Sequence, residues 1–355
     1  MKKALLAIIA IIVLGGVAFA AKIAIDRPND PQNFVNTALA NSFVIDSAKF
    51  QSSIQITGDA GGMGNGQLAL AISGSVANAT EYLPTLDYQI DLEALLNFGE
   101  QTINALVSGD LRILDEVFYG QISNFSIEGA EGLVPTEMIE PFVNKWYALS
   151  FADLKNSDPE IAAVFEEQKA QQMEMRENLK NILANNNVVL VKKMPISFGE
   201  RQPVEVVLNT DLVTSDEFLT EMEKIFTPAS LPEGAENPLA LTEEQKVELR
   251  AMLSEIGSKI DSTITLSIGK DDGILHGYTA VLNFDLAELG LPIESGRISV
   301  VLNSEITDIN QPQLVEAPAD FEEIDPLALA AQATTEDEPL EELSDEELIE
   351  PEVVE

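Results

Sequence analysis

The residue types of this 355-residue chain offer little for catalysis. His276 is the only histidine and there is no cysteine, so the chain has one imidazole and no thiolate. A serine hydrolase would need His276 as its base, yet no serine lies in a Gly-x-Ser-x-Gly elbow. His276 is in phase with Tyr278 and Leu282 in an extended pattern, which favours a hydrogen-bonded sheet residue over a general base. We expect a protein that is not an enzyme.

Metal and phosphate sites have equally weak support. Asp271, Asp272 and Asp308 do not form the alternating acids of a calcium loop, which also needs a glycine at its sixth position. The glycine-rich run at 58–66 is followed by neither a lysine nor a helix, so it predicts a turn between strands. Surface solvation explains the 60 acidic residues better than paired carboxylates for glycoside cleavage do. We predict no catalytic site, no metal site and no cofactor.

The side chains best suited to binding are apolar. An aromatic cluster near residue 146 and a methionine-containing stripe on a predicted helix could together line a cavity for an apolar ligand. For any one of these residues taken singly, plain core packing is the simpler interpretation. The candidates for a ligand cavity are Trp146, Tyr147, Phe151, Met175, Leu179 and Ile182.

Alternation of apolar and polar residues predicts strands along most of the chain. At 47–57 the apolar side chains face one way and the polar ones the other, as in a strand with one solvated face. The next two strands complete an antiparallel meander with it, and Lys270-Asp271-Asp272-Gly273 is a strong hairpin turn further on. The predicted strands lie at 47–57, 68–76, 86–92, two within 103–127, 145–151, 188–198, 203–212, 264–268, 276–284 and 298–306.

Apolar residues at helical spacing predict two helical insertions, at about 158–184 and 214–257. The first opens at Asp158-Pro159, a typical helix start. The second contains a helix in which Thr242 and Gln245 have the spacing of a capping box. Runs of strands interrupted by helices predict an α+β fold.

The N-terminus has the layout of an export signal. Lys2 and Lys3 precede the apolar run Ala4–Ala21, and small residues suit cleavage after Ala20. The run of 18 residues is also just long enough to span a bilayer, so an uncleaved anchor is the alternative. Without cysteine there is no lipobox, so any membrane attachment must come from this segment itself.

These features divide the chain into four parts. Residues 1–21 are a signal peptide or N-terminal membrane anchor, and 22–32 are a Pro-containing spacer. Residues 33–324 form one β-rich domain with the two helical insertions. Residues 325–355 are an acidic tail with apolar residues too sparse to form a core, which predicts disorder. The domain is therefore expected outside the cytoplasm, either secreted or held at the membrane.

Charge limits the partners. The formal net charge is −40, and the last 36 residues hold 15 acids without one Lys or Arg. Nucleic acid is excluded as a partner because phosphate binding needs clustered basic residues. An anionic bilayer would also repel the domain. The tail, in contrast, could contact a basic protein partner.

The order of these parts resembles the half-barrel carrier superfamily of LolA, LolB and the mycobacterial LppX and LprG lipoproteins. The resemblance covers about 42–321. It rests on the meander at 47–92, the strand Lys145-Trp146-Tyr147, the paired strands near the end, and the end of the last strand with the proline-containing segment after it, at 306–318. It implies a highly curved antiparallel sheet, a half-barrel, with helices packed on its concave face. Members of this superfamily hold acyl chains or lipoproteins in an apolar cavity between sheet and helices.

Two functions follow as expectations. The first is an extracytoplasmic, non-enzymatic domain that binds a lipid or another apolar ligand between sheet and helices. The second is a structural or interaction protein of the cell envelope, with a filled core and the acidic tail as its contact element. A hydrolase that uses His276 is a third and weaker hypothesis. The ligand, the oligomeric state and the fate of the N-terminal segment do not follow from the sequence.

Overall fold

The structure is a computed structural model. The predicted export segment and the acidic tail lie outside the described residues, as does most of the helical insertion at 214–257. Among the described residues, no helix is both long enough and apolar enough to cross a membrane. The described residues are 30–59, 64–99, 101–129, 139–157, 159–195, 199–215, 218, 247, 251, 261–285 and 296–324.

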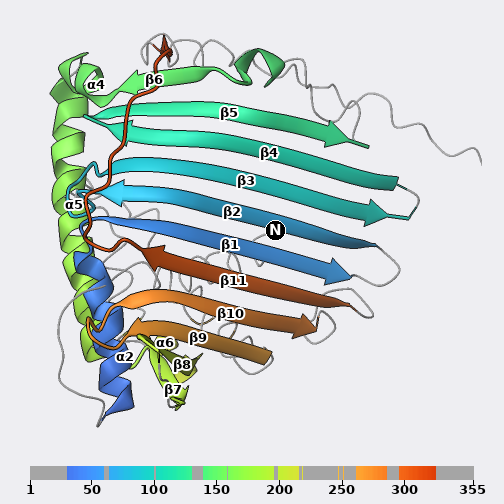
Figure 1. Ribbon diagram of the computed structural model, residues 1–355, viewed down its shortest axis with the longest axis vertical. Helices are drawn as coiled ribbons and strands as arrows, with labels where there is room; N and C mark the ends of the chain where they lie inside the picture. The colour runs from blue at the N-terminus through green and yellow to red at the C-terminus, as the bar shows by residue number, and fades with distance from the viewer. Residues whose placement is uncertain are drawn as a thin grey trace, which may run out of the picture.

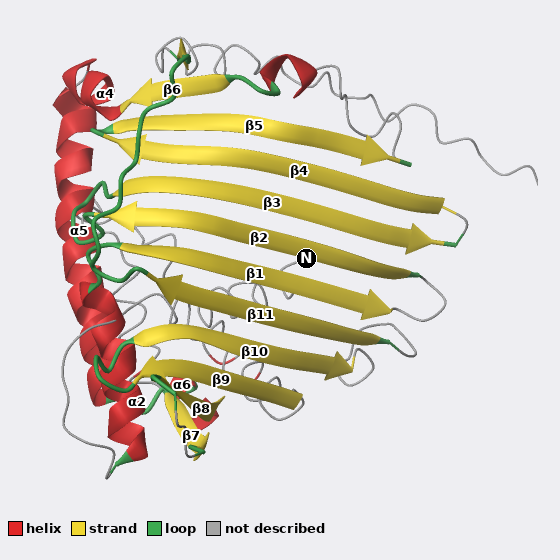
Figure 2. Ribbon diagram, viewed as in Figure 1, coloured by secondary structure: helices red, strands yellow, loops and turns green. Residues whose placement is uncertain are grey.

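One open sheet of twelve strands dominates this part of the chain (Figures 1 and 2). Its order is β12-β6-β5-β4-β3-β2-β1-β11-β10-β9-β8-β7, and only the short β12–β6 pair is parallel. The expected α+β class with a mostly antiparallel sheet is therefore confirmed. The strands are β1 Ala48–Asp59, β2 Asn65–Ala77, β3 Thr85–Phe98, β4 Gln101–Leu114, β5 Val117–Glu128, β6 Trp146–Ser150, β7 Val189–Lys193, β8 Arg201–Leu208, β9 Asp261–Gly269, β10 Leu275–Asp285, β11 Arg297–Thr307 and β12 Glu322–Glu323.

Short turns set the register of the long strands. Asp115 and Glu116 both have positive φ, 51° and 61°, which is the backbone of a two-residue hairpin between β4 and β5. Gly273 has φ 61° in the turn that joins β9 to β10. The predicted meander is present as β1, β2 and β3, and it continues through β4 and β5.

Two strands that are far apart in the sequence meet in the middle of the sheet, where β11 pairs with β1 over eleven residues. Within this pair the hydroxyls of Ser52 and Ser304 hydrogen-bond at 2.9 Å. The N-terminal meander and the C-terminal strands β8–β11 are thus two halves of one continuous sheet.

The helices gather at one end of the strands (Figure 1). The side chain of Asp30 caps α2 by accepting from the amides of Gln32 and Asn33. Arg176 of α5 donates to the carbonyl oxygens of Phe43 and Ala79, which ties this helix to η1 and to the β2–β3 turn. The helices are α2 Pro31–Ala40, η1 Asn41–Val44, η3 Glu140–Phe142, α4 Phe151–Ser157, α5 Pro159–Asn185 and α6 Thr210–Val213.

Several strand boundaries differ from the sequence expectation: the strands predicted at 188–198 and 203–212 end at Lys193 and Leu208. The aromatic strand predicted at 145–151 ends at Ser150, and Phe151 opens α4 instead. The hydroxyl of Ser150 accepts from the amide of Asp153, which is the side-chain cap that a helix start requires. The capping serine therefore turns the chain out of the sheet one residue earlier.

After β11 the chain continues as an extended strap, residues 308–324, which crosses several strands to reach β6 (Figure 1). The amide of Asn310 donates to the carbonyl of Ser47, and Arg112 donates to the carbonyl of Glu316 at 3.0 Å. Near the far end the Phe321 ring meets Tyr119 edge-on at 5.3 Å. The strap therefore follows the face of the sheet that carries Arg112 and Tyr119.

Candidate functional site

The sheet has one continuous apolar face. Side chains alternate between the two faces of a strand, so every second residue of β1 contributes to it. Ile54 pairs with Leu70 of β2 and with Leu302 of β11, which places these three side chains on the same face. The same register extends to Leu92 on β3 and Val107 on β4, and at the other side to Ala280 and Ile264.

This face is closed over one half of the sheet. On β8 and β9 the side chains of Val204, Val206 and Ile268 have no exposure at all. Val35 and Leu39 of α2 belong to the same cluster of buried residues. A second cluster on β10 and β11 continues this core toward β1. We call strands β8–β11 the closed half.

Over strands β1–β5, the open half, the apolar face is only partly covered. Leu68, Leu96 and Phe98 lie toward the strand ends remote from the helices and are 37%, 36% and 52% exposed. Between them and the helices, Leu70 and Leu92 are half-buried. Large apolar side chains that keep this much exposed surface on one face are typical of a binding surface. The open half is therefore the candidate site for an apolar ligand.

An aromatic pair marks the helix-side end of the open half. The rings of Phe50 on β1 and Tyr88 on β3 meet edge to face at 4.8 Å, on either side of Gly74. A Cβ at Gly74 would come within 2.0 Å of the carbonyl oxygen of Asp87, so only glycine fits at this position between the two aromatic residues. Burial raises the pKa of Tyr88 to about 12. This pair therefore closes the apolar face where it approaches the helices.

The three predicted aromatic residues lie in three different places. Tyr147 pairs with Gly120, so it is on the apolar face, where its ring lies 5.7 Å from Phe142. Trp146 is on the opposite face, with the guanidinium of Arg112 4.9 Å from its ring centroid. Phe151 lies on α4 and packs against Phe165 of α5, also at 5.7 Å. They do not form one cluster.

The predicted residues of the helix stripe are half-buried on α5. Ile182 packs against the buried cluster of the closed half, beside the fully buried Leu183. Met175 and Leu179 lie further toward the start of the helix. The structure thus separates Trp146 and Phe151 from Ile182, and a cavity common to all six candidates is not formed by the described residues.

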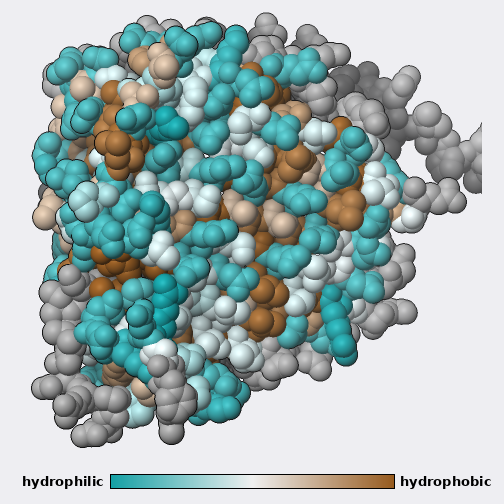
Figure 3. All heavy atoms as spheres, in the orientation of Figure 1, coloured by the Kyte–Doolittle hydropathy of each residue, from teal (hydrophilic) through white to brown (hydrophobic). Residues whose placement is uncertain are grey.

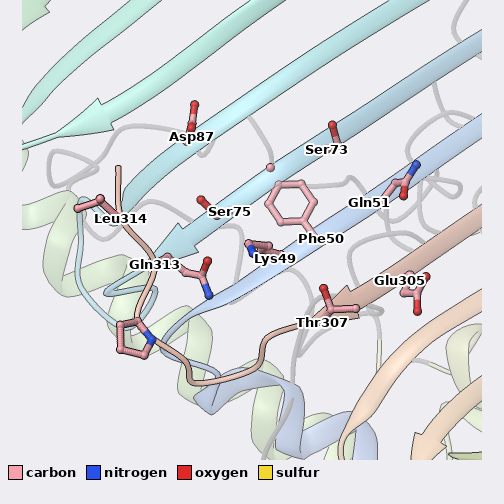
Figure 4. A pocket seen from close by; sticks show the side chains of 12 residues that line it. Lys49, Phe50, Gln51, Ser73, Ser75, Asp87, Glu305, Thr307, Gln313 and Leu314 are labelled. Atoms are coloured by element: carbon pink, nitrogen blue, oxygen red, sulfur yellow. The ribbon is translucent and has the colours of Figure 1, made fainter. Parts of the chain in front are cut away.

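Figure 3 shows the face opposite the apolar one, and this face carries a polar groove that no sequence pattern predicted (Figure 4). It has a volume of about 670 Å³ and is lined by β1, β2, β3, β11 and the strap. A second hollow of about 390 Å³ adjoins it over β8–β11 and shares Gln51 and Glu305 with it. The alternating Lys49, Gln51 and Ser53 had indicated only a solvated face. The groove is missed because it needs β11 and the strap, which are remote in sequence, to lie beside β1.

His276 is a hydrogen-bonded residue of β10. Its Nε2 lies 2.8 Å from Oδ2 of Asp272, and the other carboxylate oxygen accepts from the amide of Ile274. Its Nδ1 is buried without a hydrogen-bond partner. The expectation of a hydrogen-bonded sheet histidine is confirmed. In the part of the chain that the structure describes, no three His, Asp or Glu side chains come together as metal ligands.

Comparison with known proteins gives no match, whether with family models, curated proteins or solved structures.

Proposed function

We propose that this chain is an extracytoplasmic, non-enzymatic binding domain that holds an acyl chain or another apolar ligand on the open half of the sheet. The observation that carries the proposal is the run of partly exposed apolar side chains from β1 to β5. Burying one such side chain contributes about 1.5–3 kcal/mol, so a ligand that covers several of them binds without any charged group. The finer architecture, a half-barrel with helices on its concave face, is part of the same proposal.

Two contacts support the position of the helices. Phe218, in the second predicted helical insertion, packs against the buried cluster on the apolar side of β8 and β9. Its amide donates to the hydroxyl of Ser215, as at a helix N-terminus. Both contacts support the proposal that the insertion begins on the apolar side of the sheet, where a ligand between sheet and helices would lie.

Lipid extraction and native mass spectrometry of the protein purified from its host test the proposal. A co-purifying acyl lipid is the expected result, and its repeated absence would contradict the proposal. The decisive pair of variants is Leu96→Lys and Leu95→Lys. These neighbours are 36% and 38% exposed but lie on opposite faces of β3. We expect Leu96→Lys to lower bound lipid about tenfold and Leu95→Lys to leave it unchanged, because only Leu96 faces the ligand.

The alternative, an envelope interaction protein that uses its acidic tail, is separated from this proposal by deleting 325–355. Capture of a basic partner at low salt should then be abolished, since exposed charges act through unscreened attraction. Lipid binding should survive the deletion. If the shortened protein loses lipid as well, the ligand does not depend on the sheet alone.

A further inference from the structure

The polar face of the sheet carries its side chains in rows that run across the strands. Ser53, Asn303, Thr279 and Thr265 are paired in register on β1, β11, β10 and β9. A second row places Gln51 between Glu305 and Ser73. The two rows form the floor of the polar groove and of the hollow that adjoins it. Together, the groove and the adjoining hollow run across the strands, and we call the two together the polar groove.

This groove is lined by four lysine, arginine, aspartate and glutamate side chains, and each of them forms an ion pair. Arg201 of β8 reaches Glu305 of β11 across β9 and β10. Apart from these side chains and His276, which is paired with Asp272, the polar side chains toward the groove are neutral hydroxyl and amide groups. The pairs are Lys49–Asp308 at 2.7 Å, Arg112–Asp87 at 3.0 Å and Arg201–Glu305 at 2.8 Å.

This pairing selects the class of ligand. An anionic ligand would need basic groups that are free to contact it, and the three basic side chains of the lining, Lys49, Arg201 and His276, are each engaged by a carboxylate. Hydroxyl and carboxamide groups both donate and accept hydrogen bonds, which matches a ligand made of hydroxyl groups. Pro312 and the 83% exposed Leu314 of the strap add an apolar wall, against which the C–H face of a sugar ring can pack.

We propose that this groove is a second ligand site, which binds a neutral linear oligosaccharide laid across the strands. Its carboxylates, Asp87 and Glu305, are each held by an arginine, so the geometry supports binding of the sugar chain and not its hydrolysis. The site lies on the opposite face from the apolar ligand. The two ligands can therefore be bound together, and one site can fail without the other.

Titration of the full chain with maltohexaose and with the hexamer of N-acetylglucosamine, followed by calorimetry, tests the site. We expect at least one of them to bind with a Kd of about 0.1–1 mM, the range of a few solvent-exposed hydrogen bonds. Gln51→Ala should weaken this binding about tenfold. Gln55→Ala is the matched control, because it lies on the same strand and the same face but outside the groove. It should change Kd less than about twofold.

Three results would overturn the proposal. The first is no binding of either hexamer at about 10 mM. The second is an equal loss of affinity in Gln51→Ala and Gln55→Ala. The third is tighter binding of an acidic oligosaccharide, oligogalacturonate, than of both neutral ones. Lipid content measured on Gln51→Ala keeps the two proposals apart: lipid retained together with lost sugar binding supports two separate sites.

Discussion

The same apolar face is buried on one half of the sheet and half-exposed on the other. In the closed half, Leu282 and Val300 are 4% and 2% exposed, whereas Leu68 and Leu96 in the open half are 37% and 36% exposed. The strand patterns of the two halves are alike, since both alternate apolar and polar residues. The difference lies in packing: the side chains of β8 and β9 belong to one buried cluster that includes Val35 and Leu39 of α2, and Leu282 and Val300 belong to a second buried cluster on β10 and β11. The alternation of apolar and polar residues thus predicts which face of the sheet a side chain lies on, but not whether that side chain is buried.

The comparison predicts its largest effect for leucine truncations in the two halves. Leu282→Ala should lower the free energy of unfolding by about 2–5 kcal/mol, because it leaves a cavity in a packed core. Leu68→Ala removes the same atoms from a half-exposed position and should cost roughly 1 kcal/mol. Urea unfolding with an unchanged m-value measures both. Equal losses would mean that the open half is packed as tightly as the closed half.

Removing the Arg176 clamp should give the next largest effect. Arg176→Met leaves the carbonyl oxygens of Phe43 and Ala79 without their donor, which costs about 1–3 kcal/mol. Hydrogen exchange along α5 should rise together with the loss of stability, because this clamp ties the helix to η1 and to the β2–β3 turn.

Arg176→Lys is the control for charge. Lysine keeps the positive charge but lacks the planar fork of donors that reaches two carbonyl groups, so it should restore only part of the stability. Full restoration would show that attraction to Asp46, and not the two hydrogen bonds, holds α5 in place.

The sequence was sufficient for the local parts of this fold. The hairpin turn at Lys270-Asp271-Asp272-Gly273, the helix that begins at Pro159 and the strands of the meander follow from turn residues and from periodicity. The pairing of β11 with β1 is different. It joins residues some 250 positions apart, such as Ser52 and Ser304, and no local pattern specifies such a partner.

The same limit explains the candidate site. Trp146 and Tyr147 are neighbours in sequence, but a strand sends consecutive side chains to opposite faces, so they cannot line one cavity. Their extended pattern was visible, and the alternation rule would have separated them. The polar groove had no such signal, because the strap residues Pro312 and Leu314 reach it only through tertiary structure.

The titration of Tyr88 tests the burial of a single side chain in the open half. Its folded-state pKa of about 12 is above the ordinary value of 10.0, because burial disfavours the phenolate. A raised folded-state pKa means that the stabilisation is complete below pH 10 and is lost as the pH rises from about 10 to 12. Partial exposure reduces the effect to on the order of 1–2 kcal/mol. Tyr88→Phe should remove this alkaline loss, as measured by urea unfolding at each pH.

Phenolate absorbance then connects Tyr88 to the ligand. If an acyl chain lies on the open half beside the Phe50–Tyr88 pair, bound lipid excludes more water from this ring and should raise the pKa of Tyr88 further. Tyr278 is the internal reference, since burial also raises its pKa but it packs against the core of the closed half. Delipidation should therefore lower the midpoint assigned to Tyr88, by comparison with the Tyr88→Phe variant, and leave that of Tyr278 unchanged. Equal shifts of both midpoints would place the lipid elsewhere or show a general loosening of the sheet.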